Sequence, residues 1–263
     1  MSSPNTTQTN KACPVVAKSF NLLYIELPTI GARRVKICPS HAVSIGFFCQ
    51  SSAFIRRQLS DESKRKRPML PFDVVFSNPM MVIDCIRDRF EKFLCKKYIY
   101  RMGPKSGHTA YDQLNADFHC WSQKRNSQCT FNHHNLTSDS VHEKYAKGCE
   151  HFLALSKVSQ TKLFLCTLNP SCESNMTEKS TRKLVKAISE MFPHSHVLFV
   201  NIQVDKDLPR KSKTTRKVVN TVTVTHLTVR TPSKSNGLQL VDHGDNTFLE
   251  DQILALYDFC ETH

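Results

Sequence analysis

Two stretches decide how this chain is interpreted: Ser44-Ile45-Gly46-Phe47-Phe48-Cys49-Gln50 and, further along, Leu70-Pro71-Phe72-Asp73-Val74-Val75-Phe76-Ser77. In the first, a short apolar run meets a glycine and then a cysteine, and residues 50–59 can form a helix that buries Ile55 and Leu59. A cysteine in the first turn of a helix lies beside unpaired backbone N–H groups and the positive end of the helix dipole. Such a position lowers the pKa of a thiol and makes it a nucleophile. The alternative is that Cys49 is a small buried core residue.

Further motifs follow in a fixed order. Arg56-Arg57 lies on the helix after the cysteine, and a later segment reads Asp88-Arg89-Phe90-Glu91-Lys92-Phe93-Leu94. A histidine pair follows an aromatic residue in Phe131-Asn132-His133-His134, and a predicted helix (145–155) and strand (162–168) come after it. Together with Pro71-Phe72-Asp73, this order over residues 41–170 resembles the putative papain-like cysteine peptidase family.

The resemblance implies a mixed α/β (α+β) fold, a papain-like cysteine peptidase-type domain with a central mixed sheet flanked by helices. It also selects His133 as the histidine that would act with Cys49. Four positions depart from the family pattern: His134 replaces an aspartate, Val74 a tryptophan, Lys147-Gly148 an arginine pair, and His151 an arginine. These departures favour an alternative in which the fold is kept and catalysis is lost.

A cysteine peptidase needs an imidazole that takes the thiol proton and an Asp or Asn that orients the imidazole. If His133 is that base, its ring nitrogen should lie about 3 to 4 Å from the Cys49 sulfur. Asp73 and Asn169 are the two candidates for the third group. The backbone N–H of Gln50 would contribute to an oxyanion hole if Gln50 begins the helix.

Zinc binding is the competing chemistry, because His119, Cys120, Cys129, His133 and His134 lie close together in the sequence. Thiolate and imidazole ligands suit zinc, but the spacing matches no common zinc motif. We therefore expect no metal and no cofactor.

Length and composition limit the protein class. The chain has 263 residues, of which 40% are hydrophobic, so it can form a sizeable core. We expect a disordered polar tail over residues 1–15 and a single domain over 16–263. No apolar run approaches the roughly 20 residues that span a bilayer. Eleven cysteines without a C-x-x-C pair indicate reduced thiols. The cytoplasm is the expected compartment, with the nucleus as the alternative.

The formal net charge of +13 requires an explanation. Basic residues cluster over residues 64–67 and 206–217, which we expect to be exposed loops. Such runs can contact phosphates or an acidic protein. We expect an acidic protein or a nucleic acid partner to contact Lys64, Arg65, Lys66, Arg67, Arg210 and Lys211.

The pattern of apolar residues predicts the remaining elements. Strands are expected over 20–27, 41–45, 161–168, 196–204 and 218–229, the last near a sheet edge. Asn78-Pro79 predicts a helix start, and that helix should continue through Leu94 with an Arg87–Glu91 ion pair. Further helices are expected over 141–152, over 181–192, and from a capping box at Thr247–Glu250.

Two functions follow from the sequence. The first is a thiol hydrolase that acts on a peptide, isopeptide or amide bond of a protein or peptide substrate, through Cys49 and His133. The second is an inactive member of the same fold that acts as a binding or adaptor protein for an acidic partner or nucleic acid.

Overall fold

The computed structural model describes residues 34–46, 48–101, 109–111, 129–131, 134–168 and 177–260. The predicted tail over 1–15 and the predicted strand over 20–27 lie outside these residues. The division of the chain into a tail and one domain therefore stays a prediction.

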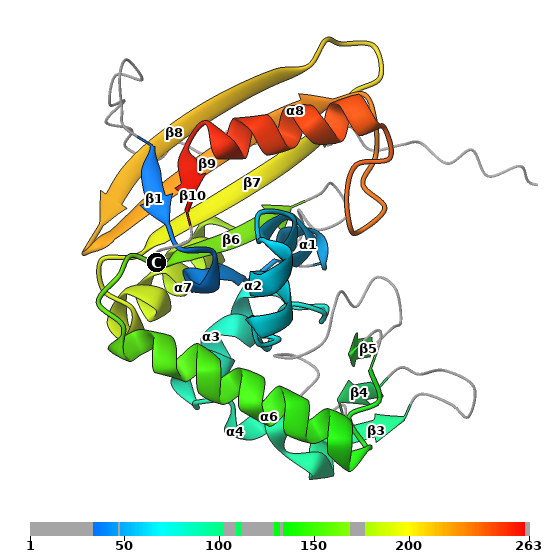
Figure 1. The fold of residues 1–263 in the computed structure, drawn as a ribbon, viewed down its shortest axis with the longest axis vertical. Helices are drawn as coiled ribbons and strands as arrows, with labels where there is room; N and C mark the ends of the chain where they lie inside the picture. Colours follow the sequence, from blue (N-terminus) through cyan, green and yellow to red (C-terminus); the bar gives the residue numbers. More distant parts are fainter. Residues whose placement is uncertain are drawn as a thin grey trace, which may run out of the picture.

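A five-stranded mixed sheet forms the centre of the molecule, with the strand order β2-β6-β7-β9-β8 (Figure 1). Four strands are parallel: β2 (Ala42–Ser44), β6 (Leu163–Leu168), β7 (His196–Val204) and β9 (Val222–Thr231). The edge strand β8 (Lys211–Val219) is antiparallel to β9. The carboxyl ends of the four parallel strands therefore share one edge of the sheet, which is where ligands bind in open α/β sheets.

Helices cover both faces of the sheet, and alternation within the strands explains why. In β6, Phe164 and Cys166 enter one apolar cluster, whereas Leu163 and Leu165 enter the other. Successive strand residues point to opposite faces, so a fully apolar strand needs cover on both sides. The first cluster is covered by α3 (Pro79–Arg87), α6 (Asp139–Ala154) and α7 (Glu178–Met191). The second is covered by α1 (Gln50–Arg57), α8 (His243–Leu254) and the parallel pair β1 (Val35–Ile37) and β10 (Tyr257–Phe259).

The predicted fold class is confirmed: the chain is a mixed α/β protein with a central mixed sheet flanked by helices. The smaller elements among the described residues are α2 (Asp61–Lys66), α4 (Glu91–Leu94) and short 3-10 helices at Pro39–His41, Lys96–Tyr98 and Leu155–Lys157. A second sheet has the strands β3 (Ile99–Arg101), β4 (Thr109–Tyr111) and β5 (Cys129–Phe131).

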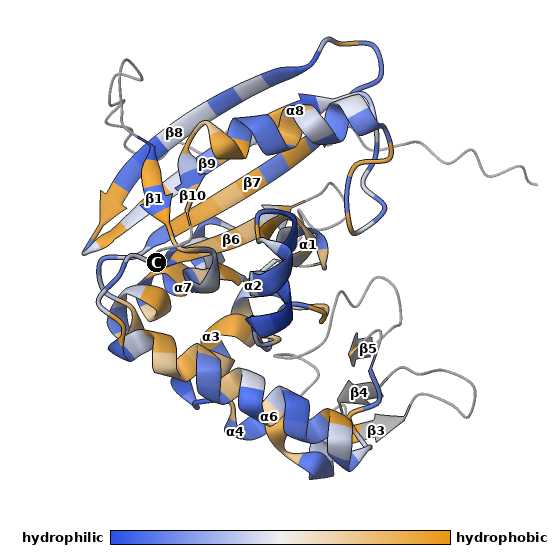
Figure 2. Ribbon diagram, in the orientation of Figure 1, coloured by the Kyte–Doolittle hydropathy of each residue, from blue (hydrophilic) through white to orange (hydrophobic). Residues whose placement is uncertain are grey.

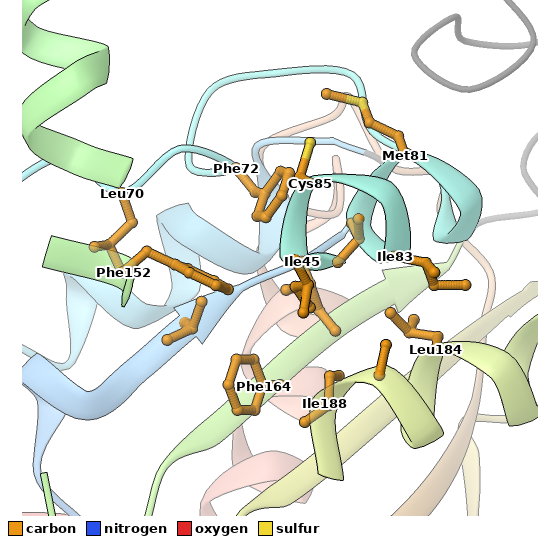
Figure 3. Packing of buried hydrophobic residues seen from close by; sticks show 14 of the residues in the cluster. Ile45, Leu70, Phe72, Met81, Ile83, Cys85, Phe152, Phe164, Leu184 and Ile188 are labelled. Atoms are coloured by element: carbon orange, nitrogen blue, oxygen red, sulfur yellow. The ribbon is translucent and has the colours of Figure 1, made fainter. Parts of the chain in front are cut away.

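Phe72 of the Pro-Phe-Asp motif lies in the core beside Cys85 of α3 (Figure 3). It is fully buried, and its ring meets the Phe152 ring edge-to-face at 5.8 Å between centroids. Phe152 in turn contacts Phe192 at 5.3 Å. Edge-to-face aromatic pairs add to the stabilisation that burial provides. The motif thus fixes the chain between α1 and α3 to the core.

Two segments predicted as loops are regular structure. Residues 61–66 form α2, because Ser60 accepts a hydrogen bond from the Ser63 N–H and acidic residues precede basic ones along the helix. Arg67, predicted to be exposed, is only 8% exposed. The basic run over 206–217 enters β8, and the single strand predicted over 218–229 is a hairpin whose turn holds Asn220 at φ 55°.

Two helix boundaries also differ from the prediction. The helix that begins at Pro79 stops at Arg87, because the Asp88 carboxylate accepts the N–H groups of Phe90 and Lys92 and Phe90 adopts φ 68°. The predicted Arg87–Glu91 pair is absent from the described residues, and Lys92 pairs with Asp84 at 2.9 Å instead. The last helix begins four residues before Thr247, since Asp242 accepts the Asp245 N–H.

Within the described ranges, no helix has the length and apolar character needed to cross a membrane.

Candidate active site

Cys49 lies where the chain leaves the sheet and enters α1. Strand β2 ends at Ser44, and Cys49 is the residue that precedes the first helical residue, Gln50. The turn between them needs Gly46, because a Cβ there would lie 2.5 Å from the Ser51 hydroxyl oxygen. The Ser77 hydroxyl donates to the Gly46 carbonyl at 2.7 Å. The Ser51 hydroxyl accepts the Thr167 N–H at 2.9 Å, which ties the start of α1 to β6.

The electrostatic environment of the thiol differs from the prediction. The pKa of Cys49 is raised, first by burial and further by the negative charge of Asp73, against a lowering by a backbone hydrogen bond. Partial burial penalises the thiolate more than the helix start stabilises it. At neutral pH the resting Cys49 is therefore a protonated thiol, and the expectation of a lowered pKa is wrong.

Asp73 is fully buried and belongs to an ion pair. Its carboxylate accepts Arg67 Nη1 at 2.7 Å and the Leu70 N–H at 3.1 Å. Arg67 Nη2 also donates to the Ala42 carbonyl of β2 at 3.2 Å. The pair thus braces the Pro-Phe-Asp turn against the strand that leads to Cys49, and its carboxylate lies close enough to influence the thiol.

Tyr145 brings α6 into the same site. The phenol is fully buried, and its pKa is raised well above the usual range by burial and then by the charges of Cys49 and Asp73. Its oxygen lies 2.9 Å from Nδ1 of the half-buried His134. The structure therefore brings together Cys49, Asp73, Tyr145 and His134.

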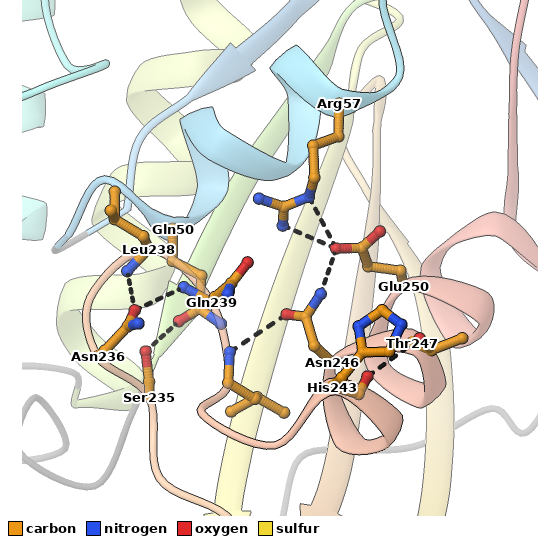
Figure 4. Close-up of polar contacts among 11 residues, drawn as sticks. Gln50, Arg57, Ser235, Asn236, Leu238, Gln239, His243, Asn246, Thr247 and Glu250 are labelled. Carbon is orange, nitrogen blue, oxygen red and sulfur yellow. Dashed lines mark hydrogen bonds and ion pairs between the residues drawn. The ribbon is translucent and has the colours of Figure 1, made fainter.

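Gln50 begins α1 and is only 3% exposed. Its side-chain carbonyl accepts the Ser235 hydroxyl at 2.9 Å, and no described group forms a hydrogen bond with its buried amide nitrogen. The loop that carries Ser235 passes beside α1, and Arg57 of α1 and Asn246 of α8 both donate to Glu250 (Figure 4). The start of α1 is thus fixed from two sides, by β6 and by the loop between β9 and α8.

Two departures from the family pattern have a physical explanation. A Cβ on Gly148 would lie 2.4 Å from the Met69 carbonyl oxygen, so α6 packs here more closely than an arginine would allow. Val74 packs against the aromatic core and is partly buried. Both changes maintain packing around the Pro-Phe-Asp turn.

Some predicted site residues lie outside the described part of the chain, namely His133 and Asn169. The same holds for His119 and Cys120 of the zinc hypothesis and for the side chain of Cys129. Elsewhere, in the ranges that the structure does describe, no group of three or more His, Cys, Asp or Glu side chains could hold a metal ion.

Sequence reasoning missed three residues of this site. Tyr145 lies within the predicted helix over 141–152, and only its bond to His134 distinguishes it from a core aromatic residue. Arg67 was assigned to a surface run, although its place just before Pro-Phe-Asp was a signal. Ser235 carried no signal, because its contact with Gln50 joins residues far apart in the sequence.

Comparison with known proteins gives one match. The family model described as "Putative papain-like cysteine peptidase (DUF1796)" matches residues 40–204, which include Cys49, Asp73, Tyr145 and His134. No curated protein and no solved structure matches the chain. The matched region covers more than half of the chain, so the chain belongs to the putative papain-like cysteine peptidase family.

Proposed function

We propose that this protein is a thiol hydrolase that cleaves a peptide, isopeptide or amide bond, with Cys49 as nucleophile and His133 as base. One observation carries the proposal. Cys49 lies at the start of α1 within electrostatic reach of Asp73 and Tyr145, and Tyr145 is bonded to His134, the residue next to His133.

The raised pKa of Cys49 determines the order of steps. His133 takes the thiol proton as the sulfur attacks the carbonyl carbon, and the backbone N–H of Gln50 stabilises the oxyanion. The imidazolium then gives its proton to the leaving amine, and a thioester remains on Cys49. Water attacks the thioester with His133 as base, which releases the carboxylic acid and restores the thiol. Asp73 and Asn169 remain the candidates for orienting the imidazole.

A second function is an inactive binding protein of the same fold. It is favoured by the protonated resting thiol and by the commitment of Asp73 to Arg67. Its partner would be an acidic protein or a nucleic acid. Seven cysteines have side chains that the structure describes, and all seven are free thiols. Free thiols are typical of the cytoplasm, which is the compartment that we propose for either function.

Labelling experiments separate the two functions. Iodoacetamide, which needs no base, should alkylate Cys49 with a midpoint above about pH 8.5. An acyl-type electrophilic probe should label the hydrolase at neutral pH, and His133→Ala should slow this at least 100-fold. His134→Ala is the comparison that tests which histidine is the base.

The matched controls are Cys85→Ala and Cys149→Ala. Both thiols are buried, and burial raises the pKa of each well above the usual range, so both variants should label like wild type. Cys49→Ala should abolish labelling. If wild type fails to label at neutral pH, or if His133→Ala labels as fast as wild type, the hydrolase is excluded and the binding protein is favoured.

A further inference from the structure

Some basic residues of this chain form ion pairs with acidic residues, and others form none among the described residues. In the first run, Lys64 pairs with Asp61 at 3.0 Å, Lys66 with Glu62, and Arg67 with the buried Asp73. Each of these cations has an acidic neighbour within its own segment. The run is therefore largely neutralised and makes a poor site for an anion.

Arg210, at the start of the second run, is committed as well. Its guanidinium lies 2.5 Å from Asp245 and 3.1 Å from Asp242. Asp245 is only 1% exposed and also accepts the Ser233 N–H at 2.8 Å. Arg210 therefore fixes the loop before α8 and is not available to a partner.

The second run continues into β8, which carries Lys211, Lys213, Arg216 and Lys217, and Arg230 lies on the neighbouring β9. Strand β8 reads Lys-Ser-Lys-Thr-Thr-Arg-Lys-Val-Val and contains no acidic residue. Among the described residues, no carboxylate forms an ion pair with Lys211, Lys213, Arg216, Lys217 or Arg230. Figure 2 shows β8 as a hydrophilic strand that ends in an apolar tip, where Val218 is 66% exposed.

These cations have the spacing of a strand. Lys211, Lys213 and Lys217 occupy alternate positions and point to one face, about 6.8 Å apart for each step of two residues. Arg230 lies directly opposite Lys211 in the register of β8 and β9, on the same face. On the neighbouring α7, Arg182 forms an ion pair with Glu178. The pKa of Lys217 is lowered by burial and then by Arg182, and Glu178 acts in the opposite direction.

Strand β8 is also the last strand of the sheet. Its inner edge pairs with β9 over nine residues, and no described strand pairs with its outer edge. Main-chain N–H and C=O groups on such an edge can pair with an added strand, which gives affinity, while side chains at alternate positions give specificity.

We propose that the outer edge of β8 binds an extended acidic segment of a partner protein as a sixth strand of the sheet. Carboxylates at every second position of that segment face Lys211, Lys213 and Lys217, and an apolar side chain of the segment covers Val218. The inference goes beyond the thiol chemistry, because it holds whether or not Cys49 is catalytic.

A nucleic acid fits this surface less well. Proteins that bind single strands provide exposed aromatic rings on which bases stack. The aromatic residue on this face of the neighbouring strands, Phe199, is 1% exposed and stacks on His226. A second copy of the chain is also disfavoured, because pairing two β8 edges brings lysines opposite lysines.

The test uses the full chain and a fluorescent eleven-residue peptide with glutamate at every second position and threonine or valine between. Fluorescence anisotropy should show saturable binding. A peptide of the same composition with its glutamates clustered at one end should bind at least tenfold more weakly. The alternating peptide with N-methyl groups on alternate amides should also bind at least tenfold more weakly. It keeps the charge but lacks the N–H groups that would form hydrogen bonds with the edge of β8.

The matched variants carry equal changes in net charge. Lys211→Glu/Lys213→Glu/Lys217→Glu should weaken binding at least tenfold, whereas Lys144→Glu/Lys157→Glu/Lys183→Glu, at three exposed sites without an ion pair among the described residues, should not. A Lys→Gln version of the β8 triple variant keeps the test valid if charge reversal disturbs folding. Cys49→Ala should bind as wild type does.

Four results would overturn the proposal: no binding of the alternating peptide, equal weakening by both triple variants, undiminished binding of the N-methylated peptide, or tighter binding of a single-stranded oligonucleotide. Concentration-dependent dimerisation that the β8 variant abolishes would assign the edge to a second copy instead. In the case of no binding, the lysines would serve only to keep the edge from aggregating.

Discussion

The phenol oxygen of Tyr145 lies 2.9 Å from Nδ1 of His134, and this bond joins helix α6 to the segment that carries the tandem histidines. The Tyr145 ring also contacts the Phe131 ring at 5.2 Å, so one side chain contacts both Phe131 and His134. The phenol also lies within electrostatic reach of the Cys49 sulfur, because a thiolate there raises the pKa of Tyr145. Tyr145 is therefore a positioning residue for the base that we propose.

Replacement of Tyr145 by Phe tests this role. The ring stays packed, so the free energy of unfolding should change by only about 1 kcal/mol for the lost hydrogen bond. Labelling of Cys49 by the acyl-type probe should slow about tenfold, because the imidazole loses its orientation, and the pH profile of labelling should shift with it. His134→Ala should give a similar loss, and the double variant should lose no more than either single one.

The control for this prediction is Tyr257→Phe. Tyr257 is equally buried, and its hydroxyl donates to Thr225 Oγ1 at 3.4 Å in the cluster on the opposite face of the sheet. Its removal should leave the labelling of Cys49 unchanged. Equal slowing by both variants would show that Tyr145 acts only through stability.

The Arg67–Asp73 pair gives a prediction about stability. Asp73→Asn leaves the Arg67 charge buried without its counter-ion, which should lower the free energy of unfolding by about 3–5 kcal/mol. Glu143→Gln, which breaks the exposed pair with Lys147 at 2.7 Å, should leave the free energy of unfolding nearly unchanged. Urea denaturation followed by circular dichroism measures both.

Arg67→Met/Asp73→Leu should recover most of the stability, because neither charge then remains in the core. If Asp73→Asn and Glu143→Gln lower the free energy of unfolding equally, the buried pair does not stabilise the contact between β2 and the Pro-Phe-Asp turn.

His226 gives the stability a defined pH dependence. Its pKa is lowered to about 4, first by burial and then by the charge of Lys217. The unfolded chain has a histidine pKa near 6.5, so between pH 6.5 and 4 the unfolded state binds more protons. The contribution of neutral His226 is fully present above pH 6.5 and is lost as the pH falls toward 4, by about 3 kcal/mol.

Denaturation curves across this pH range should therefore be flatter for His226→Gln than for wild type. The pKa of His196 is also lowered to about 4, by burial and by Arg216. His196 should therefore preserve part of the pH dependence of stability in the His226→Gln variant. His243 is exposed, so His243→Gln should follow the wild-type curve. If His226→Gln shows the full wild-type slope, His226 is not held neutral in the fold.

Local sequence signals placed most of the elements. Strand β7 spans the predicted residues 196–204, and Asn78-Pro79 begins α3 as its capping chemistry requires, with Asn78 accepting the Met81 N–H at 2.9 Å. The predicted helix boundaries that are wrong differ because side-chain hydrogen bonds to the backbone compete with the apolar pattern. Asp88 captures two N–H groups and ends a helix that the apolar pattern alone would continue. Thr247 donates to the His243 carbonyl inside α8 and does not cap the helix.

The sequence by itself determined the mixed α/β class, the family, and the place of Cys49 at the start of a helix, because these depend on residues that are close together in the chain. Only the tertiary structure decided the electrostatics and the partners. Burial raises the pKa of Cys49, Arg67 neutralises Asp73, and Tyr145 reaches His134. The same holds for the cations, since Arg210 meets Asp242 and Asp245 only when the chain folds back, whereas β8 remains basic at the edge of the sheet. Desolvation and ion pairing depend on which distant segments share a place in space, and no local pattern encodes that.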